Sequence, residues 1–226
     1  MKARIFLFIL SLGVMNAAGA QEAEYKMEIG GGLGLVAYEG DFNGNIMKGL
    51  QPVGSFVLRR NLNPRMALKF DLSVGNLKGS SDNAKTYYSE PNAQHMTFSN
   101  TLYDLTCRYE YNFWGYGKGA EFKGYHRLTP YISLGLGFTY AGGNSNAFTV
   151  NTPIGGGLKY KLKERLNIGA EWTMHFSMSD KLDGVQDPYG IKSSGIFKNT
   201  DCYSVLQFFL TYDIMPKCTT CNNNDD

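Results

Sequence analysis

Residues 167–180 read N-I-G-A-E-W-T-M-H-F-S-M-S-D, and the character of their side chains alternates with a period of two. One set is apolar and consists of Ile168, Ala170, Trp172, Met174, Phe176 and Met178. The other set is mostly polar and consists of Asn167, Gly169, Glu171, Thr173, His175 and Ser177. This alternation predicts a β-strand with one apolar and one polar face. A strand of about a dozen residues is longer than most soluble strands and long enough to cross a bilayer at a tilt. We therefore predict a membrane strand that faces lipid on one side and a polar lumen on the other.

The same pattern recurs along the chain, with turn and loop residues between the segments. The predicted strands are 25–38, 51–60, 65–77, 97–113, 130–141, 152–162, 167–180 and 201–214. The faces of 51–60 and 201–214 are ambiguous, because apolar residues occur in both of their alternating sets. Connections after the first, third, fifth and seventh segments are long and polar, whereas 61–64 and 163–166 are tight turns. This asymmetry predicts an all-β fold, an eight-stranded antiparallel transmembrane outer-membrane β-barrel with both termini in the periplasm. Side chains fill a barrel of this size, so we expect no pore.

The two ends of the chain differ in character from the barrel. Residues 1–20 combine an early positive charge, a short apolar run and a final Ala-Gly-Ala, which predicts a secretory signal peptide. The barrel domain is expected over 21–214, and 215–226 is expected to be a polar, disordered tail. The tail contains Cys218 and Cys221, a spacing that suits a local disulfide or free thiols, with redox or metal binding as the weaker reading.

Composition supports a membrane barrel and excludes some partners. The chain has 27 Gly, 15 Tyr and 14 Phe, a balance that suits close strand packing and aromatic girdles. Its net charge of +2 does not favour nucleic acid as a partner. We expect the outer membrane as the location and outer-membrane lipid as the surrounding medium.

Charged residues recur on the polar faces of the predicted strands. Buried charges are tolerated only when they pair with one another. We therefore predict a polar network in the lumen, to which Lys161 on the same face can also contribute. Its members are Glu28, Lys69, Asp71, Asp104, Arg108, Glu110, Lys159, Glu171 and His175. A soluble, lipocalin-like barrel would place apolar residues inside and fits this pattern less well.

Candidate catalytic groups are few. Glu171, His175 and Ser177 share one face of a strand, but Glu171 and His175 would lie about 13 Å apart and His175 and Ser177 about 6–7 Å apart. Neither spacing favours the direct bond that a nucleophile and its base require. The glycine strings at 30–34 and 155–157 lack the helix and Lys-Ser/Thr pair of phosphate loops. Asp180, Asp183 and Asp187 have irregular spacing for a calcium loop. We expect a non-enzymatic protein without a cofactor or metal.

Several segments together carry a resemblance to a known family. They are E-I-G-G-G-L-G-L-V-A-Y-E-G-D-F-N (28–43), R-Y-E-Y-N-F (108–113), T-P-Y-I-S-L-G-L-G-F (129–138) and T-P-I-G-G-G-L-K-Y-K-L-K-E-R-L-N-I-G-A-E-W (152–172), followed by S-D-K-L-D-G-V (179–185) and N-T-D-C-Y-S (199–204). The chain resembles the DUF6089 outer-membrane β-barrels of Bacteroidota, which include PorG-like accessory barrels of the type IX secretion system. The resemblance implies a barrel that docks a periplasmic ring, made of a lipoprotein and its partner, to the outer membrane.

A docking barrel of this kind needs a surface on its periplasmic side. The connection 114–129 offers aromatic anchors and charges, namely Trp114, Tyr116, Lys118, Phe122, Lys123 and Tyr125. The alternative for this connection is an ordinary long turn with interfacial aromatics. The alternative function is a surface barrel whose long outer loops, 78–96 and 179–200, bind a ligand or a host factor.

Overall fold

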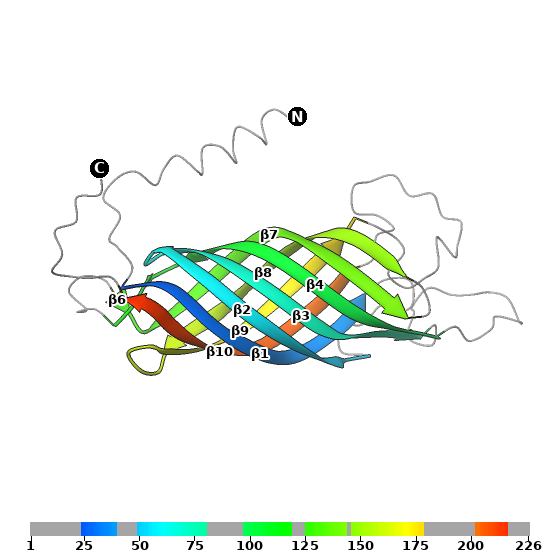
Figure 1. Cartoon of the computed structure of the whole chain (residues 1–226), viewed down its shortest axis with the longest axis horizontal. Helices are drawn as coiled ribbons and strands as arrows, with labels where there is room; N and C mark the ends of the chain where they lie inside the picture. Colours follow the sequence, from blue (N-terminus) through cyan, green and yellow to red (C-terminus); the bar gives the residue numbers. More distant parts are fainter. Residues whose placement is uncertain are drawn as a thin grey trace, which may run out of the picture.

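The computed structural model describes residues 24–39, 49–80, 97–118, 125–143, 146–178 and 202–216. Eight long strands form a closed barrel in the order β1-β10-β9-β8-β7-β4-β3-β2, and every neighbouring pair is antiparallel (Figure 1). The strands are β1 (Tyr25–Glu39), β2 (Gln51–Asn63), β3 (Met66–Ser80), β4 (Thr97–Asn112), β7 (Leu128–Gly143), β8 (Ala147–Lys161), β9 (Leu166–Ser177) and β10 (Cys202–Pro216). The predicted fold class is confirmed.

Two short strands lie at one end of the barrel, inside the connection that follows β4. They are β5 (Gly115–Tyr116) and β6 (Tyr125–His126), which pair in parallel as a separate sheet. The start of β1 and the end of β10 lie at this same end (Figure 1). We call it the terminal end and the opposite one the loop end. From the sequence we expected a connection over 114–129, and its paired segments were not predicted.

Several strand boundaries differ from the prediction. β8 begins at Ala147, five residues before the predicted start, so the predicted loop 142–151 is wrong for most of its length. The alternation continues through this stretch, because Phe148 faces outward while Thr149 and Asn151 are buried. Asn151 was read as a loop residue, but its amide donates inside the barrel to the Asp104 carboxylate. β9 ends at Ser177 rather than at residue 180, and β10 extends to Pro216, two residues beyond the predicted barrel domain.

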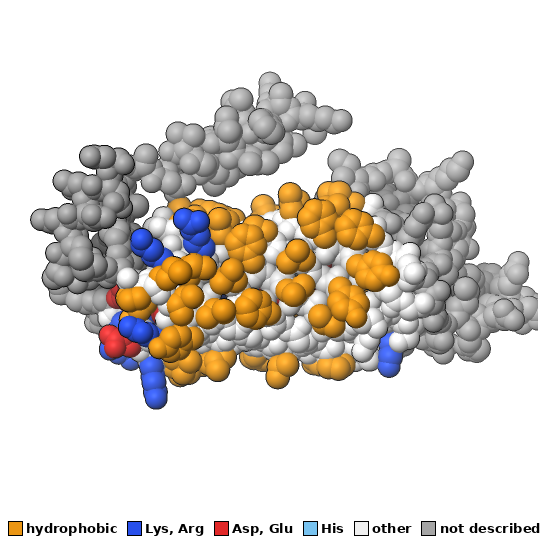
Figure 2. Space-filling model, viewed as in Figure 1, with side chains coloured by type: hydrophobic (Ala, Val, Ile, Leu, Met, Phe, Trp, Pro, Cys, Tyr) orange, Lys and Arg blue, Asp and Glu red, His pale blue; other side chains and the backbone are white. Residues whose placement is uncertain are grey.

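Apolar side chains form a broad band around the outside of the barrel (Figure 2). In the middle of β7, for example, Ile132, Leu134 and Leu136 are all exposed, while Tyr131, Ser133 and Thr139 between and beside them are buried. This inversion of the usual soluble pattern is what a bilayer demands of a barrel. It also resolves the ambiguous second strand, since Phe56 is exposed while Val57 is buried. Within the described residues, no helix is long and apolar enough to cross a membrane.

Glycines allow β1 to approach β10 closely. A Cβ atom at Gly34 would lie 2.2 Å from the Leu206 carbonyl oxygen, and one at Gly30 would lie 2.0 Å from that of Leu210. Side chains at these inward positions would force the two strands apart, so glycine is required for the curvature here.

Residues 1–23, the tail from 217 and the long loops 40–48, 81–96 and 179–201 lie outside the described residues. The predicted signal peptide, the Cys218–Cys221 pair and the acidic loop at Asp180, Asp183 and Asp187 fall there. Cys107 is a free cysteine, exposed on the outer face of β4.

Candidate functional site

The interior of the barrel is rich in charge. In the described part of the chain, six buried carboxylates face five buried cations. The carboxylates are Glu28, Asp71, Asp104, Glu110, Glu171 and Asp213, and the cations are Arg59, Lys69, Arg108, Lys159 and Lys161. This near balance of charge is what permits burial.

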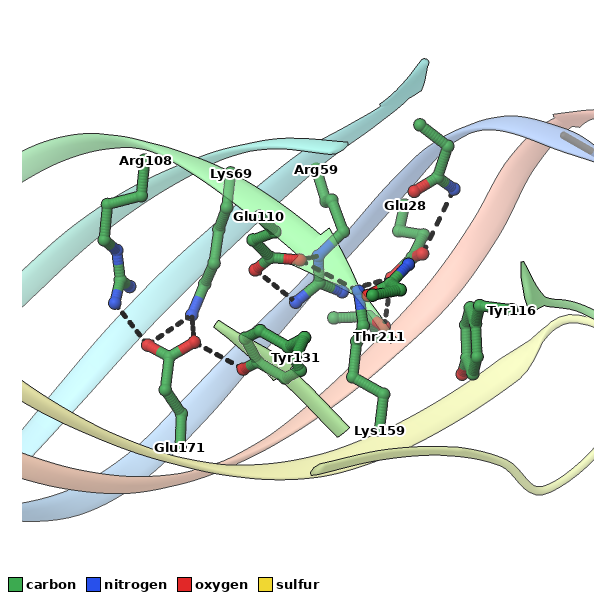
Figure 3. Close-up of polar contacts among 12 residues, drawn as sticks. Glu28, Arg59, Lys69, Arg108, Glu110, Tyr116, Tyr131, Lys159, Glu171 and Thr211 are labelled. Carbon is green, nitrogen blue, oxygen red and sulfur yellow. Dashed lines mark hydrogen bonds and ion pairs between the residues drawn. The ribbon is translucent and has the colours of Figure 1, made fainter. Parts of the chain in front are cut away.

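Glu171 on β9 is the centre of one half of this network (Figure 3). Its carboxylate accepts hydrogen bonds from the Arg108 guanidinium on β4 and the Tyr131 hydroxyl on β7. Lys69 on β3 places its Nζ 3.2 Å from both carboxylate oxygens. These donors come from strands that are not neighbours of β9 in the sheet, so the contacts cross the lumen and tie opposite walls together.

Arg59 on β2 is the centre of the other half, which lies nearer the terminal end (Figure 3). Its guanidinium binds Glu28 and lies, through Nε, 2.9 Å from Glu110 Oε2. Lys159 also donates to Glu110 at 2.9 Å, and Thr211 donates to Glu28 at 3.0 Å. Five strands therefore meet through two carboxylates.

Asp71 extends the Glu171 half, and the ring of Phe209 separates it from the Arg59 half. Asp71 lies 3.2 Å from both Lys69 and Arg108 and accepts from Gln207 at 3.1 Å. The ring of Phe209 lies between the halves, with the cationic groups of Arg59 and Lys69 each 5.1 Å from its centroid. The two halves thus meet at Phe209 in the middle of the barrel.

Asp104 anchors a third cluster nearer the loop end. It accepts from Asn151 at 2.7 Å and from Thr139 and Tyr203 at 2.9 Å. His175 stacks on Tyr203 with ring centroids 4.5 Å apart, and its Nδ1 lies 3.5 Å from Asp104 Oδ2.

Beyond this cluster the interior becomes apolar, and seven of the eight barrel strands contribute to that apolar layer. Its members are Val36, Tyr38, Val53, Leu77, Leu102, Ala141, Ala147, Tyr203 and Val205.

The residues considered for catalysis lie apart in this arrangement. Glu171 is held by Lys69 and Arg108, whereas His175 lies against Asp104 and Tyr203. The Ser177 hydroxyl lies 3.1 Å from that of Thr149. Within the described residues, no group of three or more His, Cys, Asp or Glu side chains could hold a metal ion. In this geometry the buried charges bind one another across the lumen and hold the strands together.

The connection between β4 and β7 closes the terminal end of the barrel. Tyr116 on β5 reaches inward, and its hydroxyl donates to Asn167 Oδ1 at 2.8 Å. The ammonium groups of Lys159 and Lys161 each lie 5.3 Å from the centroid of its ring. Its backbone N–H donates to the Pro64 carbonyl at 2.8 Å. Burial, followed by the Glu28 charge, raises the pKa of the Tyr116 phenol, so the hydroxyl remains a donor. A cavity of about 20 Å³ beside Tyr116, enough for one water molecule, is lined by Glu28, Lys161 and Asp213.

The six docking residues expected from sequence differ in how exposed the structure leaves their side chains. Tyr116 is only 8% exposed and is wrong as a docking anchor, because the barrel mouth takes up its side chain. Trp114 is 47% exposed, and Lys118 is exposed while its backbone N–H donates to Glu24 at 3.1 Å. Tyr125 is half-buried on β6. Phe122 and Lys123 lie outside the described residues.

All nine residues expected in the lumen are buried there, but the network has members that sequence reasoning missed. Arg59 was missed because the faces of its strand were ambiguous. The exposed Phe56 and Leu62 flank it on the other face and supply the signal for its inward position. Asp213, which binds Lys161 and Asn167, was missed because β10 is apolar on both faces near its centre. Tyr131 was missed because the expected network was limited to charged residues and His, although the alternation with Ile132 and Ser133 places it inside.

Comparison with known proteins agrees with this architecture. The sequence profile of the family described as domain of unknown function DUF6089 matches residues 3–223. The chain belongs to this family. No curated protein sequence matches this DUF6089 chain.

Solved structures similar to this chain include two bacterial proteins. Neisserial surface protein A is 12% identical, with a TM-score of 0.52, and the match covers 85% of this chain and all (100%) of that one. The outer-membrane protein OprG of Pseudomonas aeruginosa is 12% identical with a TM-score of 0.49, over 86% of this chain and 98% of that one. At this level of identity the likeness to Neisserial surface protein A shows the fold alone.

Proposed function

We propose that this barrel resides in the outer membrane and serves as a non-enzymatic docking component of the type IX secretion machinery, as PorG-like barrels of Bacteroidota do. It would hold a periplasmic ring, built from a lipoprotein and its partner, against the membrane. The sequence resemblance set out above suggests this partner. The structure supports the docking role through the way the barrel is closed and through the segment held at its terminal end.

Among the described residues, buried side chains fill much of the interior. The charged network fills the middle of the lumen, and the apolar layer fills the loop end. A small barrel filled in this way is a poor conduit, and this supports a function carried by its surfaces.

The observation that carries the proposal is the anchoring of the β4–β7 connection. Tyr116 is fixed inside the mouth by Asn167, and Gly117 donates its N–H to the His126 carbonyl at 3.2 Å. The first arm of the connection is therefore tied to the barrel and the second arm to the first, and residues 119–124 join the two arms in the sequence. An interaction segment mounted on rigid arms loses less conformational entropy on binding.

A capture experiment in the native host tests this role. Residues 119–124 are replaced by a Gly-Ser linker of equal length, which leaves Tyr116 and Tyr125 in place. The affinity-tagged full-length barrel is then purified from the outer membrane, and the co-purified ring lipoprotein is quantified. We expect at least a tenfold loss of captured lipoprotein and reduced secretion of cargo. A matched variant with a Gly-Ser linker in place of residues 81–96, at the loop end, should retain both.

The opposite pattern would overturn the proposal. If the linker at 119–124 leaves capture and secretion intact, this segment is not the dock. If the variant at 81–96 loses a surface-binding activity while secretion is unchanged, the outer loops carry the function instead.

A further inference from the structure

The outer surface of the barrel is strongly asymmetric in charge. Exposed cations gather at the terminal end, where Figure 2 shows most of the Lys and Arg side chains. We call these seven residues the basic rim: Lys26, Arg60, Arg65, Lys118, Arg127, Lys163 and Arg165. The described carboxylates near them are the exposed Glu164 and the half-buried Glu24. At the loop end, Lys78 is the exposed cation in the part of the chain that the structure describes.

The charges of the basic rim are not neutralised by described carboxylates. Among the described residues, every ion pair joins side chains buried in the lumen, and none includes a rim cation. Arg165 instead lies over the ring of Tyr25, 5.7 Å from its centroid. The rim is therefore available to anions from outside the barrel.

The position of the rim fits the headgroup level of a bilayer. Exposed aromatic side chains occur on the same end of the barrel wall, namely Tyr109, Phe113, Trp114, Tyr160 and Tyr212. Such aromatics mark the membrane–water interface. Arg60 pairs across the sheet with Met27 and Leu68, which belong to outward-facing rows. Its side chain therefore extends from the lipid-facing wall rather than into the mouth.

The rim also surrounds the mouth instead of forming one patch. Its residues come from β1, β2, the β2–β3 turn, both arms of the β4–β7 connection and the β8–β9 turn. A protein partner would contact one sector of such a ring, whereas a lipid leaflet contacts the whole circumference. Anionic headgroups attract Lys and Arg placed near the membrane surface.

We propose that the basic rim binds the anionic phosphate headgroups of phospholipids in the leaflet at the terminal end of the barrel. This selects anionic over zwitterionic lipid as the first shell there and fixes the depth of the barrel. The inference does not depend on the proposed docking partner, and it can be tested with the purified chain and lipid alone.

The two tryptophans of the chain allow a local measurement. In a Trp172→Phe background, Trp114 is the single fluorophore and lies at the rim. The full-length protein is folded into vesicles of phosphatidylcholine and phosphatidylglycerol, with one or the other lipid brominated. Quenching gives the relative binding constant of the two lipids at Trp114. We expect a preference of at least about threefold for phosphatidylglycerol at low salt. The preference should approach one at about 1 M salt, because screening weakens exposed charges.

Charge-neutral variants complete the test. Combining Arg60→Gln, Arg65→Gln, Lys163→Gln and Arg165→Gln should abolish the preference, whereas Lys78→Gln at the loop end should retain it. The Arg60/Arg65 and Lys163/Arg165 pairs are also tested separately, each expected to lower the preference in part, in case the fourfold variant does not fold. Equal quenching by the two lipids in the parent chain, or an undiminished preference in folded rim variants, would overturn the inference.

Discussion

At the scale of single residues, the interior depends on charges that balance one another. Glu171 accepts from Arg108, Lys69 and Tyr131 at once, and all four side chains are buried. A buried ion pair is not necessarily more stable than an apolar pair of the same shape, because both charges lose their hydration. Removing one partner is different, since it leaves the other charge buried and unpaired.

Replacing Glu171 by Gln should therefore destabilise the barrel strongly. Lys69 and Arg108 would keep Asp71 as their remaining shared carboxylate. We expect a loss of about 3–5 kcal/mol in the free energy of unfolding, measured by urea titration of the barrel folded into lipid vesicles. The matched control is Glu164→Gln in the exposed β8–β9 turn, which should change the free energy by less than about 0.5 kcal/mol. Equal stability of the two variants would show that the lumen charges are not coupled.

At the scale of one strand, neighbouring positions occupy opposite environments. On β7, Leu134 is 56% exposed at the middle of the outer face, whereas Ser133 beside it is buried in the lumen. Side chains in the lipid-facing row must therefore be apolar, and how strictly this holds depends on their depth in the bilayer. It is strict at the bilayer midplane and relaxed at the interfaces, where water and headgroups are near.

A pair of arginine substitutions tests this depth dependence. Leu134→Arg should destabilise the barrel by about 2–4 kcal/mol, because the guanidinium lies at the midplane. Leu162→Arg, at a site 42% exposed in the β8–β9 turn, should cost only about 0–1 kcal/mol. Both values come from equilibrium unfolding in vesicles, with the parent chain as reference. If both variants were equally stable, the outer face of β7 would not be the lipid face.

At the scale of the whole molecule, side chains close the lumen at both of its ends. Tyr116 and the β5–β6 pair cover the terminal end, and the apolar layer with Val36, Leu77 and Leu102 fills the loop end. Between these closures lies the charged network. Side chains thus fill the described interior at both ends and in the middle.

Because the lumen is closed, we predict that the protein does not conduct ions across a membrane. Reconstituted in a planar lipid bilayer, the parent chain should give no steady ion conductance. Tyr116→Ala should also give none, because the apolar layer at the loop end still blocks the path. A porin in the same apparatus serves as the positive control. Steady, ohmic conductance from the folded parent chain would contradict the filled interior.

Alternation predicted which way most side chains face, and this was enough to anticipate a large part of the lumen. Glu171 and Lys159 lie in cleanly alternating segments and were placed inside from sequence. Arg59 and Asp213 lie in strands where apolar residues occupy both faces, so periodicity could not place them. The early start of β8 was missed because Asn151 resembles a loop residue, whereas its amide is satisfied by Asp104 inside the barrel.

The sequence by itself determined the period of two, the length of the strands, their number and the apolar outer face, because these depend on local side-chain direction and on the thickness of the bilayer. Only the tertiary structure decided which charges pair across the lumen, because contacts such as that of Lys69 with Glu171 join strands that are not neighbours in the sheet. It also decided that Tyr116 turns into the mouth. That choice depends on Asn167, Lys159 and Lys161 meeting at one point, which happens only when the barrel closes.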